Sequence, residues 1–291
     1  MLEVKIEQYP KARFSYGGDA YNSAYYLALQ GNNVYFMSSI GSDKPSQRLL
    51  QQWKKDGVKT DFVHVSKQKK LGLYCIETDS SGERSFSYWR DNSASRYFFL
   101  EADTKQLLTQ FNRGDWFYFS LISLAMLKEQ SRAGFITFIK ALRQQGVSLA
   151  FDNNYRPELW ESQALACDYL DQVLPLIHMY LPSVADEMAL RDATQKSVLA
   201  QLSALKIAEI VVKNGADSCH LYTSSGHYRY QFESVVAIDS TAAGDSFNAG
   251  YISARLNKKS AQAAVESGCQ LASQVIKHPG AIVPADKLTL R

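Results

Sequence analysis

Residues Asp239 to Tyr251 read DSTAAGDSFNAGY, and this stretch decides what the rest of the chain must provide. An apolar, β-branched run, Val235 to Ile238, precedes it, and a helical pattern follows. The sequence therefore predicts a buried strand, a turn of small residues and then a helix. Ala242, Ala243 and Gly244 carry no bulky side chain, so their backbone N–H groups can point at one spot. The macrodipole of the helix adds partial positive charge there, which predicts an anion site.

A carboxylate stands at the entrance of this predicted helix. Asp245 is placed to take a proton from a hydroxyl group, and an anion hole beside a base favours phosphoryl transfer from a nucleotide to an alcohol. The alternative is an ordinary strand-to-helix loop whose helix is capped by Thr241.

The bulk composition argues against several classes of function. The net charge is +3 over 291 residues, which is too small and too dispersed for a nucleic-acid-binding face. The longest apolar run, Trp116 to Leu127, is too short and too interrupted by serine to cross a membrane. The 4 cysteines form no C-x-x-C pair and predict reduced thiols in a cytoplasmic protein. Neither G-x-G-x-x-G after the first strand nor a Walker or H-E-x-x-H motif is present.

Strand and helix signals alternate along most of the chain. The predicted helices are 20–30, 46–56 and 132–145, and the predicted strands are 34–40, 116–120, 147–151 and two that end at Pro182 and Lys213. This rhythm predicts an α/β fold in which helices cover both faces of a mostly parallel sheet. Ligands bind beyond the carboxyl ends of such strands. Four polar residues are predicted at these ends: Asp152, Ser183, Lys213 and Asp239.

One region breaks the rhythm. Residues 70–90 alternate in the manner of strands, with a hairpin turn at Asp79 to Gly82, and residues 61–65 and 11–16 also have an extended pattern. We expect lid strands drawn from 11–16 and 61–90 to form a small antiparallel sheet that projects from the main domain. Because such a sheet needs one face covered, it is predicted to act as a lid, a homo-oligomer contact or both.

The stretch 239–251 resembles the signature of the ribokinase-like (PfkB-type) carbohydrate kinases, which is close to D-T-x-G-A-G-D-x-F. Ala243 stands where a glycine is usual. Four further segments match the same family, so the resemblance covers residues 14–284. It implies a single ribokinase-like three-layer domain over residues 1–291, with ATP and Mg²⁺ as cofactors and a monovalent cation as a further candidate. It also implies that Asp245 is the base and that the amides of Ala242, Ala243 and Gly244 stabilise the phosphoryl charge.

The segment Tyr16 to Asn22 resembles the sugar-binding G-G-x-x-x-N element of that family. The resemblance implies that Gly18, Asp19 and Asn22 bind the acceptor, since glycine lets a ligand approach the backbone and an amide both donates and accepts. A simple glycine turn before a helix is the alternative.

The segments Gly72 to Tyr74, Gly82 to Arg84 and Tyr88 to Arg90 resemble the lid of the subgroup that phosphorylates 2-dehydro-3-deoxygluconate. Strand alternation puts Tyr88 and Arg90 on one face, and the planar fork of arginine suits a carboxylate. Tyr74, Tyr88 and Arg90 are therefore the implied ligands of a sugar acid. An arginine that faces solvent or an acidic neighbour is the alternative.

The segment Asp152 to Trp160 is similar to the D-x-N-x-R-x-x-L-W element of the family. It implies that Asn154 and Arg156 lie where the acceptor and phosphate sites meet, and Arg156 is a candidate for holding either the substrate carboxylate or the phosphoryl group. Residues 182–187 take the place of an N-x-x-E element that assists Mg²⁺ through water, with Ser183 in place of the asparagine. Glu187 is then the implied metal residue, and an acidic first turn of a helix is the alternative.

The resemblance also implies a nucleotide site near the ends of the later strands. Its residues are Asn154, Arg156, Ser183, Lys213, Gly215, Ala216, Ala242, Gly244 and Ala281.

The N-terminal region departs from the family pattern. Relatives have a strand of the V-x-x-x-G-E type before the G-G-D element, whereas residues 1–10 here contain no such glycine. We expect either that the start is misassigned or that the protein lacks a sheet strand, which would expose the edge of a central strand.

The implied activity is ATP-dependent phosphorylation of 2-dehydro-3-deoxy-D-gluconate at its terminal hydroxyl, an Entner–Doudoroff-type step of sugar-acid catabolism. Two alternatives stay open. One is a kinase for a neutral sugar, of the fructokinase or ribokinase type. The other is an inactive, N-terminally shortened homologue that only binds a sugar acid.

Overall fold

The computed structural model describes residues 1–78, 84–232 and 235–290. Its largest sheet has six strands in the order β12-β11-β10-β9-β8-β7. These strands are β7 (Trp116–Ser120), β8 (Ser148–Asp152), β9 (Met179–Tyr180), β10 (Glu209–Asn214), β11 (Ser218–Thr223) and β12 (Gly226–Gln231). Strands β7, β8, β9 and β10 run parallel to one another. β11 is antiparallel to both β10 and β12. The predicted α/β fold with a mostly parallel sheet is confirmed.

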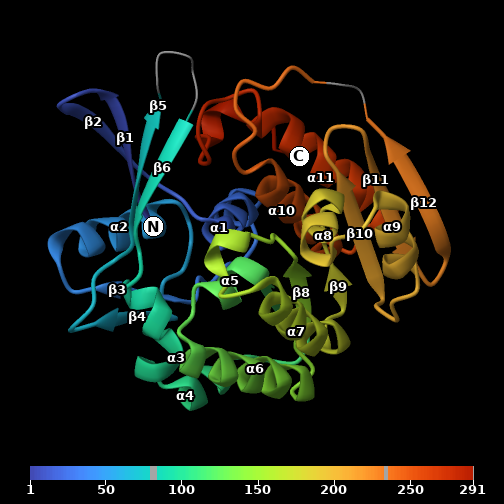
Figure 1. Cartoon of the computed structure of the whole chain (residues 1–291), viewed down its shortest axis with the longest axis horizontal. Coiled ribbons are helices and arrows are strands. Elements are labelled where there is room, and N and C mark those ends of the chain that lie inside the picture. Colours follow the sequence, from blue (N-terminus) through green and yellow to red (C-terminus); the bar gives the residue numbers. More distant parts are fainter. Residues whose placement is uncertain (79–83, 233–234, 291) are drawn as a thin grey trace.

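Helices cover both faces of this sheet (Figure 1). On one side lie α6 (Glu129–Gln144), α7 (Gln163–Val173), α8 (Val184–Arg191) and α9 (Gln195–Ser203), and on the other α1 (Asp19–Leu29), α10 (Ala243–Leu256) and α11 (Ala261–Val275). The remaining helices are α2 (Lys44–Lys55), α3 (Phe98–Glu101), α4 (Thr104–Leu108) and α5 (Leu121–Ala125).

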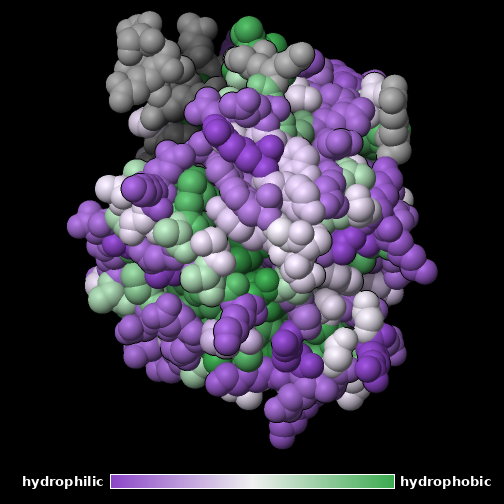
Figure 2. All heavy atoms as spheres, turned by 90° about the vertical axis from the view of Figure 1, so that its right-hand side faces the viewer, coloured by the Kyte–Doolittle hydropathy of each residue, from purple (hydrophilic) through white to green (hydrophobic). Residues whose placement is uncertain are grey.

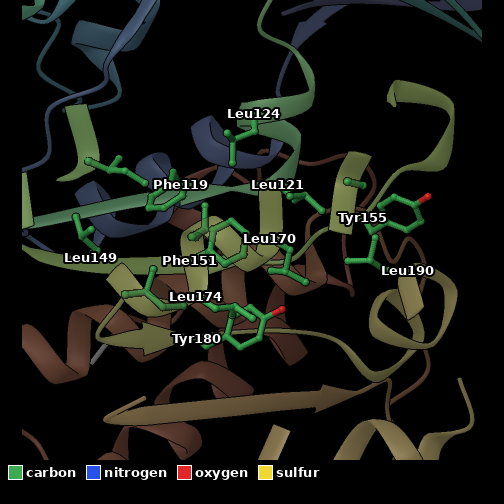
Figure 3. Close-up of a cluster of buried hydrophobic side chains, with 14 of the residues drawn as sticks. Phe119, Leu121, Leu124, Leu149, Phe151, Tyr155, Leu170, Leu174, Tyr180 and Leu190 are labelled. Atoms are coloured by element: carbon green, nitrogen blue, oxygen red, sulfur yellow. The ribbon is translucent and has the colours of Figure 1, made fainter. Parts of the chain in front are cut away.

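Successive residues of the central strands enter different hydrophobic cores. Leu149 and Phe151 pack with α6 and α7, whereas Ala150 packs with the residues of α10 and α11. In the first of these cores Phe151 stacks on Tyr180, with 5.6 Å between the ring centroids (Figure 3). Because alternate side chains of a strand point to opposite faces, a strand that is apolar at every position is buried between two helical layers.

A second, two-stranded sheet stands apart from the large one. It pairs β3 (Ser38–Gly41) in parallel with β4 (Val63–Ser66). The prediction that residues 61–65 belong to the lid is therefore wrong, because their partner is β3. Within the described residues, β3 and β7 each leave one edge without a partner strand. In this strand order β7 is an end strand of the large sheet.

The lid is a four-stranded sheet at the upper left of Figure 1, in the order β2-β1-β5-β6. Its strands are β1 (Leu2–Gln8), β2 (Lys11–Tyr16), β5 (Leu73–Thr78) and β6 (Arg84–Trp89). It is antiparallel except between β1 and β5, which run parallel. Sequence reasoning missed β1, although its residues alternate between apolar and charged. The predicted turn at 79–82 lies outside the described residues.

Residues 235–238 do not form the predicted buried strand. Val236 is 90% exposed and Ile238 is 66% exposed. The N–H groups of Ile238 and Asp239 both donate to the carbonyl oxygen of Ile276, at 2.8 and 3.2 Å. The segment therefore runs past the end of α11, where its backbone finds an acceptor outside the sheet.

The face that includes β12 is mostly hydrophilic (Figure 2). This end strand alternates between exposed and half-buried residues, as expected where only one side of a strand is covered. Among the described residues, no helix is both long and apolar enough to cross a membrane.

Helices α10 and α11 touch each other at two glycines. A Cβ atom on Gly250 would lie 2.7 Å from the carbonyl oxygen of Ser267 and 2.9 Å from the Cα of Gly268. A Cβ on Gly268 would lie 2.8 Å from the carbonyl oxygen of Phe247. The backbone contact fixes the position of α10, which carries most of the decisive stretch.

We predict that Gly250→Ala destabilises the protein by about 1–3 kcal/mol, because an added methyl group must push two backbones apart. Gly134→Ala, in the middle of α6, is the matched control. A Cβ at Gly134 would come no closer than 3.4 Å to its nearest neighbour, the side chain of Phe99. That change is expected to be neutral or to stabilise by about 0.5–1 kcal/mol through helix propensity. Urea unfolding compares the two, and equal stability would contradict the close-packing argument.

Candidate active site

The predicted anion loop lies at the start of α10, and Asp239 holds its shape. The Oδ1 atom of Asp239 accepts from the backbone N and from the Oγ1 of Thr241, at 3.0 and 2.6 Å, and its Oδ2 accepts from the N of Gly280 at 3.0 Å. Ala242 has a left-handed conformation with φ 62°, and no side chain caps the helix. Thr241 is thus not the cap, and the first turn of α10 is open to a ligand.

The three predicted amides are not equivalent. The N–H of Ala243 donates to the carbonyl oxygen of Ser240 at 3.2 Å and closes the turn itself. The first N–H groups of a helix have no acceptor within it, so the amides of Gly244 and Asp245 are the ones left open toward a ligand. The role of the Ala243 amide in anion binding stays a prediction, and in this structure that amide is engaged within the loop.

The carboxylate of Asp245 is 9% exposed and faces helix α1. Its Oδ2 accepts a hydrogen bond of 2.8 Å from the Nδ2 of Asn22. The Oδ1 of Asn22 accepts in turn from the N of Gly18, at 3.3 Å, where φ is 139°. The structure therefore brings the predicted acceptor-binding element and the predicted base together.

Two further carboxylates lie close to Asp245. Asp19 accepts from the Oγ of Ser120 at the end of β7, and Asp152 ends β8. Burial and then the charge of Asp19 raise the pKa of Asp245 to about 7, against the hydrogen bond from Asn22, and the charge of Asp152 adds to the rise. Burial also raises the pKa of Asp19. A carboxylate with a pKa near neutrality is suited to accept a proton at the pH of a cell.

Lys213 is the cation of this cluster. From the end of β10, its Nζ donates to the Oδ2 of Asp152 at 3.1 Å and to the Oδ1 of Asn248 at 2.9 Å. The same Nζ would lie 3.8 Å from a Cβ on Gly244. The ammonium group therefore lies beside the anion loop, where it would attract the oxygens of a phosphate.

Sequence reasoning assigned no role to Ser120, Asn248 or Glu3. Asn248 stands three residues after Asp245 on the same helix, so its place on the same face was available from spacing alone. The contact between Ser120 and Asp19 spans 101 residues, and the contact between Tyr74 and Glu3 spans 71. No local pattern signals such distant pairs.

The lid comes down over the acceptor-binding element. The hydroxyl of Tyr74 donates to Glu3 on the neighbouring strand β1, and its oxygen would lie 3.7 Å from a Cβ on Gly17. The guanidinium carbon of Arg90 lies 3.9 Å from the centre of the Tyr88 ring, so the two side chains share one face, as predicted. Burial lowers the pKa of Arg90, which means that an anion beside it would offset a desolvation cost.

The second arginine of the predicted site is more exposed. The Nη1 of Arg156 donates to the Oδ1 of Asp186 at 3.1 Å and to the carbonyl oxygen of Tyr155 at 2.6 Å. The neighbouring Asn154 is buried, and its N donates to the Oδ1 of Asp152 at 3.3 Å.

Glu187 lies deeper than an acidic helix start requires. It is fully buried and accepts from the Nδ2 of Asn153 at 3.1 Å, from the hydroxyl of Tyr180 and from the Nε of Arg191 at 2.7 Å. Ser183 caps the same helix by accepting from the N of Asp186 at 3.0 Å. Three donors thus engage Glu187. Among the described residues, no cluster of three or more His, Cys, Asp and Glu side chains is arranged to hold a metal.

The last three residues predicted for the nucleotide lie in two segments, 215–216 and 281. Gly215 and Ala216 lie on the exposed turn between β10 and β11, where Gly215 has φ 58°. Ala281 is buried, and its carbonyl oxygen accepts from the hydroxyl of Tyr26 at 2.7 Å. Its Cβ would lie 3.6 Å from a Cβ on Gly17, which places it on the acceptor side. The hydrogen bond between Gly280 and Asp239 turns this segment inward.

Comparison with known proteins gives concordant matches. The 2-dehydro-3-deoxygluconokinase of Haemophilus influenzae is 36% identical, over 100% of this chain and 94% of its own length. The enzyme of the same name from Dickeya dadantii is 38% identical, over 94% of this chain and 91% of its own. The crystal structure of 2-dehydro-3-deoxygluconokinase from Thermotoga maritima has the same fold, with a TM-score of 0.82 at 20% identity over 97% of this chain and 93% of that one.

The family model described as pfkB family carbohydrate kinase matches residues 3–288. That match spans nearly the whole chain and includes the anion loop, the G-G-D element and the lid. With the identities above, it shows that the chain belongs to the pfkB family of carbohydrate kinases.

Proposed function

We propose that this protein, acting as a single domain with a lid, phosphorylates 2-dehydro-3-deoxy-D-gluconate at its terminal hydroxyl, with ATP as donor. The observation that carries the proposal is the 2.8 Å hydrogen bond between Asn22 and Asp245. It joins the group that would hold a sugar hydroxyl to the group that would take the proton from it.

Asp245 is the base in this proposal. Its pKa of about 7 lets the carboxylate ionise near neutral pH and then keep the proton that leaves the attacking hydroxyl. Asn22 orients the carboxylate, and burial keeps bulk water from competing for the same oxygen.

The donor would lie between the anion loop and the ends of the later strands. ATP supplies the phosphoryl group, and Mg²⁺ bound to its phosphates neutralises charge. The residues fit such a ligand, because the first turn of α10 has no side-chain cap and Lys213 stands beside Gly244. Asn154, Ser183, Gly215 and Ala216 complete the proposed nucleotide site, with Glu187 as an indirect support for the metal and a monovalent cation as a candidate activator. Dependence on ATP also supports a cytoplasmic location.

The carboxylate of the substrate calls for a cation on the acceptor side. Arg90 is half-buried and lies over the aromatic ring of Tyr88, whereas Arg156 is exposed and already paired with Asp186. We therefore assign the substrate carboxylate to Arg90. A neutral sugar would bring no charge to offset the desolvation of this guanidinium, which disfavours a fructokinase or ribokinase activity.

The test is ADP release with ATP–Mg²⁺ and four acceptors: 2-dehydro-3-deoxygluconate, gluconate, fructose and ribose. The wild type is expected to turn over the keto-deoxy acid. The rate of the Asp245→Ala variant is expected to be lower by on the order of a hundredfold or more. Arg90→Leu is expected to lower kcat/KM for the keto-deoxy acid by at least about tenfold, because a charged hydrogen bond is lost. Any activity on neutral sugars is expected to fall less.

An active Asp245→Ala protein would refute its role as base. Equal losses on acidic and neutral acceptors in Arg90→Leu would refute the carboxylate assignment. No turnover of any acceptor by the folded wild type would refute the kinase activity of this chain and favour a protein that only binds a sugar acid.

The pKa of Asp245 also predicts a pH-dependent stability. Folding raises this pKa from 3.8 to about 7, so the folded state binds more protons and loses stability as the pH rises from about 4 to 7. Three pH units correspond to at most about 4 kcal/mol. Asp245→Asn is therefore expected to be more stable than the wild type at pH 8, with less than half of that difference left at pH 5.

Thermal unfolding at the two pH values measures this effect. Asp217→Asn, on the exposed turn after β10, is the control for the substitution itself. The burial argument fails if the stability difference for Asp245→Asn is the same at both pH values.

We also propose that the lid contributes to a homo-oligomer. Phe14 and Trp89, on the two outer strands of the lid, are 68% and 61% exposed, and a partner that covers them would remove apolar surface from water. Phe14→Asp is expected to shift the mass measured by light scattering toward the monomer. A monomeric wild type would exclude this contact.

A further inference from the structure

Residues 280–283 have no regular secondary structure, yet Ala281 and Val283 are buried, with exposed fractions of 8% and 0%. A buried backbone that lies outside helices and sheets still needs partners for its N–H and C=O groups, because an unpaired buried group is costly. The groups that satisfy this segment therefore decide where it lies.

Two adjacent tyrosines of α1 supply those partners. The hydroxyl of Tyr26 donates to the carbonyl oxygen of Ala281 at 2.7 Å and accepts from the N of Val283 at 3.2 Å. The hydroxyl of Tyr25 donates to the carbonyl oxygen of Val283 at 2.9 Å. A phenol hydroxyl both donates and accepts, so Tyr26 holds the segment at two points, as a neighbouring strand would.

The segment in turn holds the anion loop. The N–H of Gly280 donates to the Oδ2 of Asp239 at 3.0 Å, and the Oδ1 of Asp239 accepts from the N of Thr241 at 3.0 Å. The next residue, Ala281, has its Cβ 3.6 Å from a Cβ on Gly17 in the acceptor-binding element. Two consecutive residues thus reach both halves of the active site.

We propose that Tyr26 is a positioning residue for phosphoryl transfer. Through residues 280–283, its hydroxyl sets where the anion loop lies relative to the acceptor-binding start of α1. The inference rests on the proposed function, which assigns a sugar acid to one end of this path and the phosphoryl donor to the other. Tyr26 is 0% exposed, so it acts on the reaction only through its neighbours.

The hydrogen bond between Asn22 and Asp245 does not replace this connection. It holds the side chain of the base, whereas Asp239 holds the loop backbone that precedes α10. Tyr26 stands four residues after Asn22, on the same side of α1. Phosphoryl transfer depends on the placement of donor and acceptor together, so loss of the Tyr26 hydroxyl is expected to misplace the donor while the base stays in position.

Tyr26→Phe tests the proposal, because it removes the hydroxyl and keeps the ring in the core. The first readout is amide hydrogen exchange of the unliganded protein. The amide of Val283 loses its acceptor directly. The amides of Gly280 and Thr241 are bonded to Asp239 and not to Tyr26, yet they are expected to exchange at least about tenfold faster, because their segment is released.

Tyr251→Phe is the matched control. Tyr251 is also 0% exposed, and its hydroxyl donates to the Oε2 of Glu209, at the start of β10, at 2.7 Å. Like Tyr26→Phe, this variant loses a buried hydrogen bond, and the Tm of both is expected to fall by a few degrees. In Tyr251→Phe, exchange at Gly280 and Thr241 is expected to stay at the wild-type rate.

Kinetics with ATP–Mg²⁺ and 2-dehydro-3-deoxygluconate give the second readout. In Tyr26→Phe, kcat is expected to fall by at least about tenfold, while KM for the acid changes by less than about threefold. Burial raises the pKa of Tyr26, so its hydroxyl stays protonated at neutral pH. The ratio of variant to wild-type kcat is therefore expected to be the same at pH 6 and pH 8. Tyr251→Phe should keep kcat within about twofold of the wild type.

The proposal is overturned if Gly280 and Thr241 keep their wild-type exchange in Tyr26→Phe, or if Tyr251→Phe accelerates them equally, which would indicate a general loss of stability. It is also overturned if Tyr26→Phe raises KM and leaves kcat unchanged. A kcat ratio that varies with pH would replace it with a direct effect of the hydroxyl on the proton of Asp245.

Hydrogen exchange needs no turnover, so the two proposals can fail separately. If the wild type phosphorylates no acceptor, the proposed function fails, and the exchange rates of Gly280 and Thr241 still decide whether Tyr26 holds the loop.

Discussion

The burial of a carboxylate beside two others is the constraint around which this site is organised. Asp19, Asp152 and Asp245 come from three elements that meet at the carboxyl ends of the parallel strands. The pKa of Asp245 reaches about 7 because burial and the charge of Asp19 both disfavour its ionised form. Lys213 and Asn248 neutralise and hydrogen-bond Asp152, whereas the hydrogen bond to Asp245 comes from the uncharged amide of Asn22. A chemical base arises here from the unequal distribution of a few donors.

Much of this arrangement follows from sequence, because its causes are local. The alternation of strands and helices predicts a sheet with covered faces, and the small residues from Ala242 to Gly244 predict an uncapped helix start. Both features are present. Helical spacing would also have placed Asn248 beside Asp245, had it been applied to the whole of the decisive stretch.

The features that sequence did not predict depend on which strand finds which partner. β4 has the extended pattern expected of a lid strand, yet it pairs with β3. The run 235–238 has the composition of a buried strand, yet its backbone is satisfied by the end of α11. β-branched residues favour an extended backbone, and the competition for hydrogen-bond partners then decides where that backbone lies. Ser120 and Glu3 entered the site for the same reason, through contacts with residues far away in the chain.

The contact between α10 and α11 has a mechanical consequence. Gly250 rests on the backbone of α11, and the carbonyl of Ile276, just after that helix, receives the N–H groups of Ile238 and Asp239. The segments before and after the anion loop thus both contact α11 or the residue that follows it. This helix lies on the opposite side of the loop from the lid. Backbone contacts therefore join the loop, α10 and α11 into one packed unit. The lid strands, which carry Tyr74 and Tyr88, form a separate sheet, so the carboxylate of Asp245 is positioned by helices that the lid does not include.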